Sequence, residues 1–535
     1  MTDKPVVLMP EDIQRIMGKD AQRNNILAAR MVAEMVKTTL GPKGMDKMLV
    51  SPTGEIVVTN DGVTILEEMQ IEHPAAKMMV DIAKTQDSEV GDGTTTVVMI
   101  AGKLLENAER LLDQKIHPTI IAKGYKIAAE KCQEILNEIA LRVLPEDEDI
   151  LKQVAMTSMT GKGAESSKEI FADIIVQAIK QIQVDGKIDL NDIKIEKSRG
   201  EGIADTELIS GIVLDKERLS SDMPSKVSNA RIVLVDFPLE LKNPGIDTKI
   251  SISSPEQLQG FLNQEERLIK EMVGKIKETN ANVVFCQKGI DDFAQYLLAK
   301  SGIYACRRIA KSDMEKLAKA TGGKIVSNIN EISSSELGFA EIVEEVKHSD
   351  DSFTYVKGCK NPKAVTILIH GGTGHIIDEI ERAFKDGLGV VSSSLKTGLV
   401  VPGGGAIEIE LAQRLRQFGQ SLKGREQLAV EQFASALEFI PATLAENAGL
   451  DPIDVLTELK SKHDAGEKNA GLNLFNNKVE DVLEAKIIEP YKIKTQAISS
   501  ACEVANMILR IDDVIASNGK RKSGMNIHPE MNEEF

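Results

Sequence analysis

The residues best suited to chemistry lie in the hexapeptide GDGTTT at 91–96, which is followed directly by an apolar-striped helix predicted to reach Leu112. Glycines let a backbone approach a phosphate, while the free amides and the dipole at a helix start favour negative charge. The Asp92 carboxylate beside them suits magnesium, which prefers a few carboxylates together with phosphate oxygens. The P-loop lysine is missing, so the motif predicts either a phosphate site of another kind or a simple capped turn.

Two other glycine turns precede this motif, and each has a plain structural interpretation. The LGPKG turn at 40–44 follows a helix predicted to begin near Asp20, which is typical of simple helix termination. The NDG tripeptide at 60–62 lies between β-rich runs at 56–59 and 63–66, so its local pattern predicts a hairpin turn. Neither turn by itself indicates a ligand.

Two further glycine turns lie in the second half of the chain. The GGG run at 403–405 precedes a predicted helix but lacks the GxGxxG spacing of a dinucleotide loop. The HGGTG turn at 370–374 follows a strand-like run and precedes a helix predicted to end near 386–387. Three charged residues of that helix share one face at four-residue spacing, which is typical of a solvated stripe: Asp378, Arg382 and Asp386.

The elements that must position these turns fall into three regimes. Residues 11–150 and the stretch from Pro402 to 516 are predominantly helical by apolar periodicity, whereas 214–368 alternates β-rich runs with helices and predicts a mainly parallel sheet. Two helical blocks therefore bracket a mixed insert. Within the insert, a capping box at 254–257 predicts a long helix, and periodicity alone favours an ordinary core helix.

Composition excludes several classes of function. The 535 residues include 82 acidic and 65 basic side chains, and the net charge of -17 disfavours nonspecific binding to nucleic acids and anionic membranes. Aromatic residues make up only 3% of the chain, with no tryptophan, so few side chains could stack on nucleic-acid bases. The five cysteines form no CxxC pair and are predicted to be buried free thiols. Signatures of serine hydrolases, zinc proteases and protein kinases are missing from the sequence.

The chain also lacks the pattern of a membrane or secreted protein. Its longest uncharged run, at 364–377, is shorter than the roughly 20 apolar residues that a spanning helix needs. The first residues carry acids and prolines where a signal peptide needs an apolar core, so we expect a cytoplasmic protein. The polar segment 517–535 is predicted to be a mobile tail.

Five longer sequence segments indicate a function that the isolated glycine turns leave open. They are LGPKGMDKMLV at 40–50, TNDGVTIL at 59–66, GDGTTT at 91–96, VPGGGAIEIEL at 401–411 and KTQAI at 494–498. Together, and in this order, they resemble the group II chaperonins, with the look of an archaeal thermosome subunit. The resemblance runs essentially from end to end of the chain.

The resemblance implies a multidomain α+β chaperonin fold. Its mostly helical equatorial domain is formed by both chain ends, an α/β intermediate domain acts as a hinge, and an α/β apical domain carries a helical protrusion. The implied segments are equatorial 1–145 and 403–535, intermediate 146–213 and 369–402, and apical 214–368. The protrusion, a built-in lid, is implied at about 243–279, which replaces the core-helix interpretation for the outer part of that helix.

The function implied by the family is that of an ATP-dependent molecular chaperone. Such a subunit assembles with itself or with paralogous subunits into a double ring, captures unfolded or partly folded proteins, and encloses them on ATP hydrolysis, with ATP and Mg²⁺ as cofactors. The implied partners include no nucleic acid and no membrane. A ring-forming scaffold or holding protein with regulatory ATPase activity is the alternative, and a small-molecule kinase would need a second substrate pocket.

The resemblance also implies roles for single residues. Asp61 and Asp386 would be catalytic and would orient and activate the attacking water, Asp92 would hold magnesium, and Lys162 would sense the γ-phosphate. Because Asp386 belongs to the hinge segment, the site would be complete only when that domain closes. The other implied nucleotide contacts are Leu40, Gly41 and Pro42, the phosphate loop Gly93, Thr94, Thr95 and Thr96, Gly404, Gly405 and Glu489 around the ribose, and Asn473 near the adenine.

Overall fold

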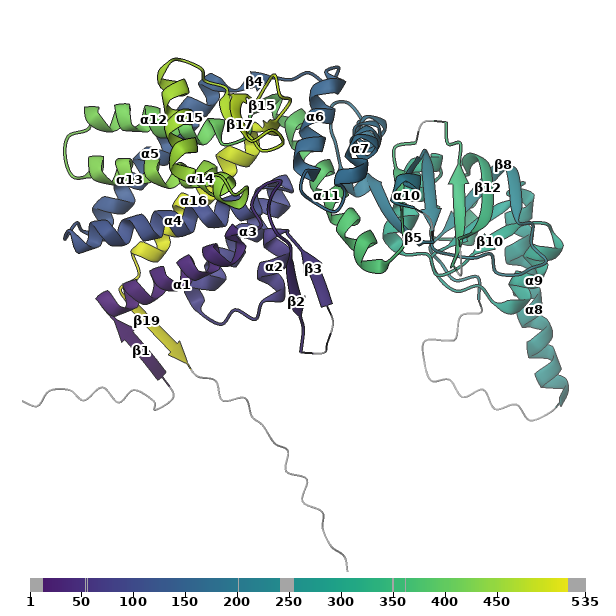
Figure 1. Cartoon of the computed structure of the whole chain (residues 1–535). Coiled ribbons are helices and arrows are strands. Elements are labelled where there is room, and N and C mark those ends of the chain that lie inside the picture. Colours follow the sequence, from purple (N-terminus) through teal and green to yellow (C-terminus); the bar gives the residue numbers. More distant parts are fainter. Residues whose placement is uncertain are drawn as a thin grey trace, which may run out of the picture.

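The computed structural model describes residues 13–52, 54, 56–200, 202–240, 255–348, 351–360 and 362–517 (Figure 1). The molecule is elongated, with a large helical body at one end, a body built around a sheet at the other, and a smaller middle block between them. Both ends of the described chain, purple and yellow in Figure 1, belong to the helical body. The predicted mobile tail lies outside the described residues, apart from Ser517.

The helical body combines elements from both ends of the chain. Its N-terminal elements are β1 (Ile13–Met17), α1 (Lys19–Lys37), β2 (Lys47–Val50), β3 (Ile56–Thr59), α2 (Gly62–Glu68), α3 (Pro74–Val90), α4 (Thr94–Asp113), α5 (Pro118–Ile139) and β4 (Leu141–Arg142). Its C-terminal elements are β15 (Leu399–Pro402), α12 (Ala406–Ser421), α13 (Glu426–Leu437), α14 (Phe439–Asn447), α15 (Pro452–Asp464), β16 (Ala470–Asn473), β17 (Lys478–Asp481), β18 (Ile488–Pro490), α16 (Tyr491–Leu509) and β19 (Asp513–Ser517).

Helix α4 is the centre of this body. It packs against α1 and α3 from its own end of the chain and against α13 and α16 from the other end. In its apolar stripe, the side chains of Val97, Leu104 and Leu105 are fully buried. A Cβ at Gly102 would lie only 2.4 Å from the Ala33 Cβ, so glycine lets α1 and α4 approach closely. The two ends of the chain therefore share one apolar core.

The terminal strands β1 and β19 pair antiparallel, which ties the two ends of the described chain together. Arg15 and Asp513 form an ion pair across them, with the guanidinium Nη2 2.5 Å from the carboxylate. Helical periodicity did not predict this pair, because each strand is short and its partner lies at the opposite end of the sequence.

The middle block consists of a small sheet and three long helices. Its strand β14 (Val365–Gly371) lies between β5 (Ile193–Arg199), which is parallel to it, and β6 (Glu207–Ile209), which is antiparallel. The helices are α6 (Glu148–Met159), α7 (Lys168–Ile182) and α11 (Gly374–Thr397), and the short 3-10 turns are η1 (Glu165–Ser167), η2 (Leu190–Asp192) and η3 (Ile203–Asp205). The apolar core of this block continues into the helical body through Ile488 and Ile493.

Helix α11 does not end where the sequence predicted. The expected end near 386–387 is wrong, since the helix continues to Thr397. Its glycines serve close packing instead of termination: a Cβ at Gly387 would lie 2.5 Å from Ile175 Cδ1, and one at Gly389 would lie 2.9 Å from the Val90 carbonyl oxygen. The second approach brings α11 of the middle block directly against the end of α3 in the helical body.

The sheet body is mixed, not mainly parallel. Its elements are β7 (Gly211–Leu214), β8 (Lys226–Val235), α8 (Pro255–Glu278), β9 (Val283–Cys286), α9 (Asp292–Lys300), β10 (Tyr304–Cys306), α10 (Lys311–Thr321), β11 (Ile325–Val326), η4 (Ile329–Glu331), β12 (Gly338–His348) and β13 (Asp351–Lys357). Strands β8 to β11 pair in parallel, whereas β12 pairs antiparallel with β8 and β13, and β13 with β7. The prediction is wrong for the second half because β12 and β13 follow each other directly, which allows only an antiparallel pair.

The long helix predicted from the capping box is confirmed as α8, which begins at Pro255. Its inner turns pack on the sheet through the buried side chains of Ile269, Val273 and Ile276. Figure 1 shows the first turns of α8 extending away from the sheet. Residues 241–254 lie outside the described part of the chain, so the lid at about 243–279 stays a prediction, as do the domain boundaries.

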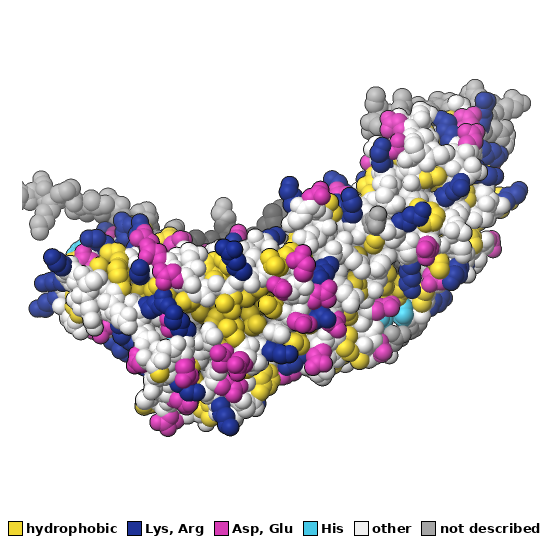
Figure 2. Space-filling view, turned by 90° about the horizontal axis from the view of Figure 1, so that it is seen from above, with side chains coloured by type: hydrophobic (Ala, Val, Ile, Leu, Met, Phe, Trp, Pro, Cys, Tyr) yellow, Lys and Arg dark blue, Asp and Glu magenta, His cyan; other side chains and the backbone are white. Residues whose placement is uncertain are grey.

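Two further predictions concern the whole described chain. All five cysteines are buried free thiols, as predicted. Among the described helices, none is long and apolar enough to cross a membrane. Figure 2 shows a face on which acidic and basic side chains are interspersed, with apolar side chains gathered near the middle of the larger body.

Candidate functional site

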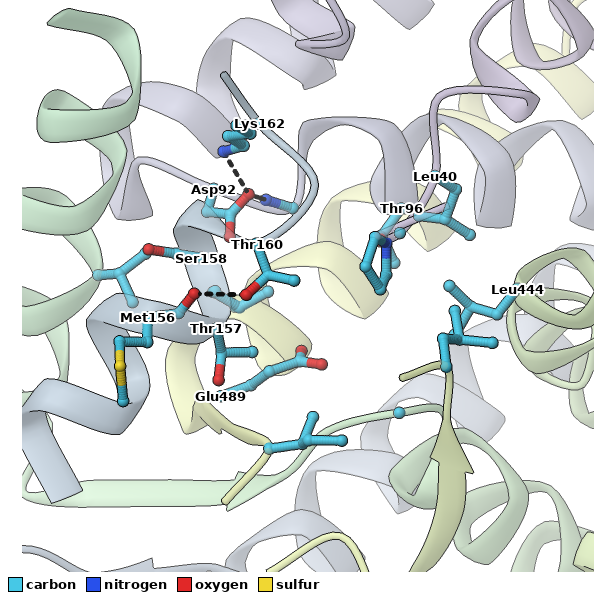
Figure 3. Close-up of a pocket in the computed structure, with 18 of the residues that line it drawn as sticks. Leu40, Asp92, Thr96, Met156, Thr157, Ser158, Thr160, Lys162, Leu444 and Glu489 are labelled. Carbon is cyan, nitrogen blue, oxygen red and sulfur yellow. Dashed lines mark hydrogen bonds and ion pairs between the residues drawn. The ribbon is translucent and has the colours of Figure 1, made fainter. Parts of the chain in front are cut away.

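A cavity of about 430 Å³ lies where the middle block meets the helical body (Figure 3). Its walls come from the starts of α4 and α12, the loop after α1, the end of α6 and the segment around β18. The implied site residues that line it are Leu40, Gly41, Pro42, Asp61, Asp92, Gly93, Thr94, Thr95, Thr96, Lys162, Gly404, Gly405 and Glu489. Asp386 and Asn473 are not part of this lining. Segments separated by hundreds of residues therefore meet around one space.

The GDGTTT loop brings the start of α4 to the cavity. Gly91 and Gly93 both have φ of 82°, a left-handed conformation that favours glycine. Gln86 holds the loop by donating its Nε2 proton to the Asp92 carbonyl oxygen at 3.0 Å. The N-cap position of α4 is Gly93, which has no side chain to cap the first amides of a 20-residue helix. This favours an open anion site over the simple capped turn.

The predicted hairpin turn at 60–62 is wrong. Strand β3 pairs with the preceding strand β2, and Gly62 begins helix α2 with Asp61 as its N-cap. One Asp61 carboxylate oxygen accepts hydrogen bonds from the amide and hydroxyl of Thr64, at 3.0 and 2.7 Å, and the other accepts one from the Thr94 hydroxyl at 3.2 Å. The local NDG pattern fits both outcomes, and contact with α4 selects the helix.

Lys162 lies among three carboxylates from different elements. Its Nζ forms a short ion pair with Asp386 of α11 and lies 3.8 Å from the Asp92 carboxylate, toward which it points in Figure 3. Asp386 is only 13% exposed, so the predicted solvated stripe is wrong for this residue. The continuation of α11 past Gly387 carries Asp386 down to this junction.

Burial and charge perturb both members of this pair. Burial alone would lower the pKa of Lys162, but the neighbouring carboxylates of Asp386 and Asp92 raise it overall, so the lysine is charged. Burial raises the pKa of Asp386, Lys162 opposes this rise, and Asp61 adds to it. A buried carboxyl of raised pKa that contacts a cavity-lining lysine is a candidate proton acceptor.

A second charge cluster forms part of the cavity wall, where β18 and α16 meet. Lys494 of α16 donates hydrogen bonds to Glu408 of α12 at 2.8 Å and to Glu489 of β18 at 2.5 Å. Burial raises the pKa of Glu489, Lys494 opposes this rise, and Glu408 adds to it. One ammonium group therefore pairs with two carboxylates, and it holds Glu489 against the GGG loop at 403–405.

The donors in the cavity fit a magnesium ion that is shared with a phosphate. Asp92 and Asp61 supply carboxylates beside the free amides of α4, and Mg²⁺ typically takes one or two carboxylates plus phosphate oxygens. Across the described ranges, no group of three or more His, Cys, Asp or Glu side chains could hold a metal alone. A magnesium ion held here would take its remaining ligands from phosphate oxygens and water.

Comparison with known proteins agrees with this architecture. Residues 32–518 match the TCP-1/cpn60 chaperonin family. The chain belongs to this family. A thermosome subunit of Methanopyrus kandleri is 58% identical over 518 residues, which cover 96% of this chain and 95% of that protein. The thermosome subunit beta of Archaeoglobus fulgidus is 58% identical over 523 residues, covering 97% and 96%, and a Pyrococcus horikoshii thermosome subunit is 56% identical over 526, covering 98% and 96%.

Membership confirms the predicted multidomain α+β chaperonin fold. Two implied site residues lie outside the cavity lining of this chaperonin, and of these Asp386 contacts the lining residue Lys162. Asn473 instead bonds within the β16–β17 hairpin, where its Nδ2 donates to Glu480 at 2.7 Å and its Oδ1 accepts from the Phe475 amide at 2.9 Å. The neighbours Leu472 and Leu474 line the cavity instead. They form its apolar end together with Leu40 and Leu444.

Sequence reasoning missed several polar residues of the site. Thr157 of α6 and Thr160, the C-cap residue of that helix, line the cavity, and Figure 3 shows Thr157 close to Glu489. The hydroxyl-rich run before Lys162 was a signal that could have indicated them. Glu408 was also missed, although an acidic residue inside the apolar run AIEIEL indicates a buried partner.

Proposed function

We propose that this chaperonin subunit hydrolyses ATP in the cavity and uses hydrolysis to drive a folding chamber. In this proposal the chain assembles with itself or with paralogous subunits into a double ring. It captures unfolded or partly folded proteins and encloses them under its lid. The observation that carries the proposal is the convergence of two groups of charged residues from different bodies. Lys162 and Asp386 of the middle block meet Asp92, which directly precedes α4, and Asp61, the N-cap residue of α2.

The triphosphate of ATP fits the start of α4. The first turn of α4, from Thr94 to Thr96, offers free amides and hydroxyls, and Lys162 adds a positive charge to the cavity. Magnesium, when bound, would neutralise phosphate charge, and Asp92 would hold it. The apolar end formed by Leu40, Leu444 and their neighbours suits the base, while Glu489 suits a sugar hydroxyl.

In the proposed reaction a water oxygen attacks the γ-phosphorus as the bond to the bridging oxygen breaks, and ADP leaves with the bonding electrons. Asp61 and Asp386 orient this water, and the Asp386 carboxylate accepts its proton. Lys162 stabilises the negative charge that develops on the phosphoryl oxygens. Lys162 also contacts Asp386. When Lys162 is attracted to a γ-phosphate, the charge next to the Asp386 carboxylate therefore changes.

This arrangement supports a link between hydrolysis and movement of the middle block. Lys162 and Asp386 both belong to that block, whereas the α4 start and Asp61 belong to the helical body. Differential contact with the γ-phosphate in open and closed positions is what such a switch requires. Strand β14 leads into α11, and it pairs with β5 and β6. The chain continues from β5 and β6 into the sheet body.

Gly93→Ala is expected to weaken ATP binding by about 5- to 30-fold, because this range corresponds to about 1–2 kcal/mol of left-handed backbone strain. A Cβ at this position would also lie 2.8 Å from Ile493 Cγ2. Binding is measured by calorimetry with ATP and magnesium. The matched control is Gly186→Ala, since Gly186 has φ of 77° but open space around its Cβ. Equal weakening of ATP binding in both variants would contradict a phosphate site at the GDGTTT loop.

The direct test is electron microscopy of the purified chain with no nucleotide, and then with ATP and aluminium fluoride, alongside phosphate-release assays. We expect double rings that close only with the nucleotide, together with magnesium-dependent hydrolysis. Rings that hydrolyse ATP but never close would favour the scaffold or holding protein. Monomers or single rings in both conditions would mean that partner subunits are missing or that the chamber proposal is wrong.

A further inference from the structure

Asn60 links the helical body to the loop that carries Lys162. It lies between β3 and the α2 N-cap residue Asp61, lines the cavity and is 8% exposed. Its Nδ2 donates a hydrogen bond of 2.8 Å to the carbonyl oxygen of Gly161. Since Gly161 directly precedes Lys162, this bond acts on the backbone from which the lysine side chain extends.

The loop has little freedom at the point where Asn60 holds it. Gly161 has φ of 80°, and a Cβ there would lie 2.6 Å from Pro42 Cα, so the loop packs closely on the backbone of the helical body. Its other hydrogen bonds run within the middle block, from Thr160 Oγ1 to Met156 and from the Lys162 amide to Met159. The Asn60 bond therefore crosses from one body to the other at the moving part of the proposed site.

The side-chain carbonyl oxygen of Asn60, in contrast to the Nδ2 group, makes no hydrogen bond within the described part of the chain that would stabilise the fold. Its Oδ1 is buried and has no hydrogen-bond partner among the described residues. An unpaired buried acceptor is unfavourable, so the amide is not explained by stability alone. Replacement of the whole amide by an apolar group of similar size would remove that unpaired acceptor together with the single bond to Gly161.

We infer that Asn60 is a positioning residue for hydrolysis. It holds the loop at 160–163 so that Lys162 reaches the γ-phosphate when the middle block lies against the helical body. Asn60 acts through Lys162 and not on the nucleotide itself. This inference rests on the proposed ATP hydrolysis.

The test is Asn60→Leu in the full chain. We expect kcat for ATP hydrolysis to fall about tenfold, which is the upper range for the loss of one net hydrogen bond, with ADP affinity unchanged within about twofold. The matched control is Asn107→Leu. Asn107 is also buried, donates its Nδ2 proton to the Gln432 carbonyl at 2.9 Å and leaves its Oδ1 unpaired, but it lies within the helical body. This control should leave kcat unchanged.

A double-mutant comparison distinguishes positioning from a general structural effect. Adding Asn60→Leu to Lys162→Met should cause no further loss of kcat, because the bond acts only through that lysine. Additive losses, or a wild-type kcat in Asn60→Leu, would overturn the inference while the wild-type chain still hydrolyses ATP. A wild-type chain that does not hydrolyse ATP would instead refute the proposed function.

If Asn60→Leu does not fold, Asn60→Ser is measured in its place, together with hydrogen exchange of residues 157–165 in the complex with ADP and aluminium fluoride. Faster exchange in this segment than in the wild type supports the inference. Unchanged exchange overturns it.

Discussion

Replacing Asp386 with asparagine is expected to slow ATP hydrolysis by about 100-fold or more while leaving ATP affinity almost unchanged. A positioned general base typically contributes about 10²–10⁴ to a rate, and an amide cannot accept the proton of the attacking water. Affinity should persist because Asp386 contacts Lys162 and does not belong to the phosphate loop. Phosphate release in a single turnover measures the rate, and calorimetry measures the affinity.

The same helix supplies the control for this experiment. Asp378 is also on α11, but it is 49% exposed and pairs with Lys197 at the surface, with 2.7 Å between Nζ and the carboxylate. Asp378→Asn should therefore hydrolyse ATP at the wild-type rate. An unaltered rate in Asp386→Asn would remove Asp386 from the mechanism. Folding assistance that survives Asp386→Ala in ATP without hydrolysis or lid closure would refute the coupled chamber.

Lys494→Met is expected to lower the free energy of unfolding by about 3–5 kcal/mol, the range for removing one partner of a buried ion pair. The ammonium group lies between Glu408, which is buried, and Glu489, which is half-buried at the cavity wall. Without it, two like charges would remain close together in the core between α12 and α16. Urea unfolding followed by circular dichroism at pH 8 measures the loss.

The pH dependence of this loss has a definite sign. The pKa of Glu489 is raised in the folded chain, because burial and Glu408 outweigh Lys494. Between its unfolded and folded pKa values the native state binds more protons than the unfolded chain, so this group's contribution to stability falls as pH rises. Removing Lys494 raises the folded pKa further. The destabilisation should therefore be largest at pH 8 and smaller at pH 5.

Two variants separate this explanation from a general loss of packing. Lys492→Met removes an exposed pair with Glu89, whose side chains are 36% and 52% exposed, and should cost less than about 1 kcal/mol at either pH. Adding Glu408→Gln to Lys494→Met removes one of the two like charges and should recover part of the stability. Equal losses at both pH values, or no recovery, would refute the electrostatic explanation.

Local signals were enough to predict many elements of this chaperonin. Helix α4 begins directly after Gly93, α8 begins at Pro255, and α12 begins directly after the GGG loop. Glycine conformation, capping and apolar periodicity act within a few residues, so they can be read along the chain. The order of the longer strings was also sufficient to indicate the family, to which the whole-length comparison assigns the chain.

Only the tertiary structure decided how distant elements meet. A glycine that can end a helix can equally let two elements approach, and contact with Ile175 and Val90 selected the second role in α11. Because α11 continues past Gly387, Asp386 reaches Lys162. In the same way, contact with α4 selected a helix start instead of a hairpin turn at the NDG tripeptide. The Asn60 bond and the Lys494 cluster also join segments far apart in sequence. Sequence by itself determined the local elements and the family, whereas packing between segments decided which charged groups share the cavity.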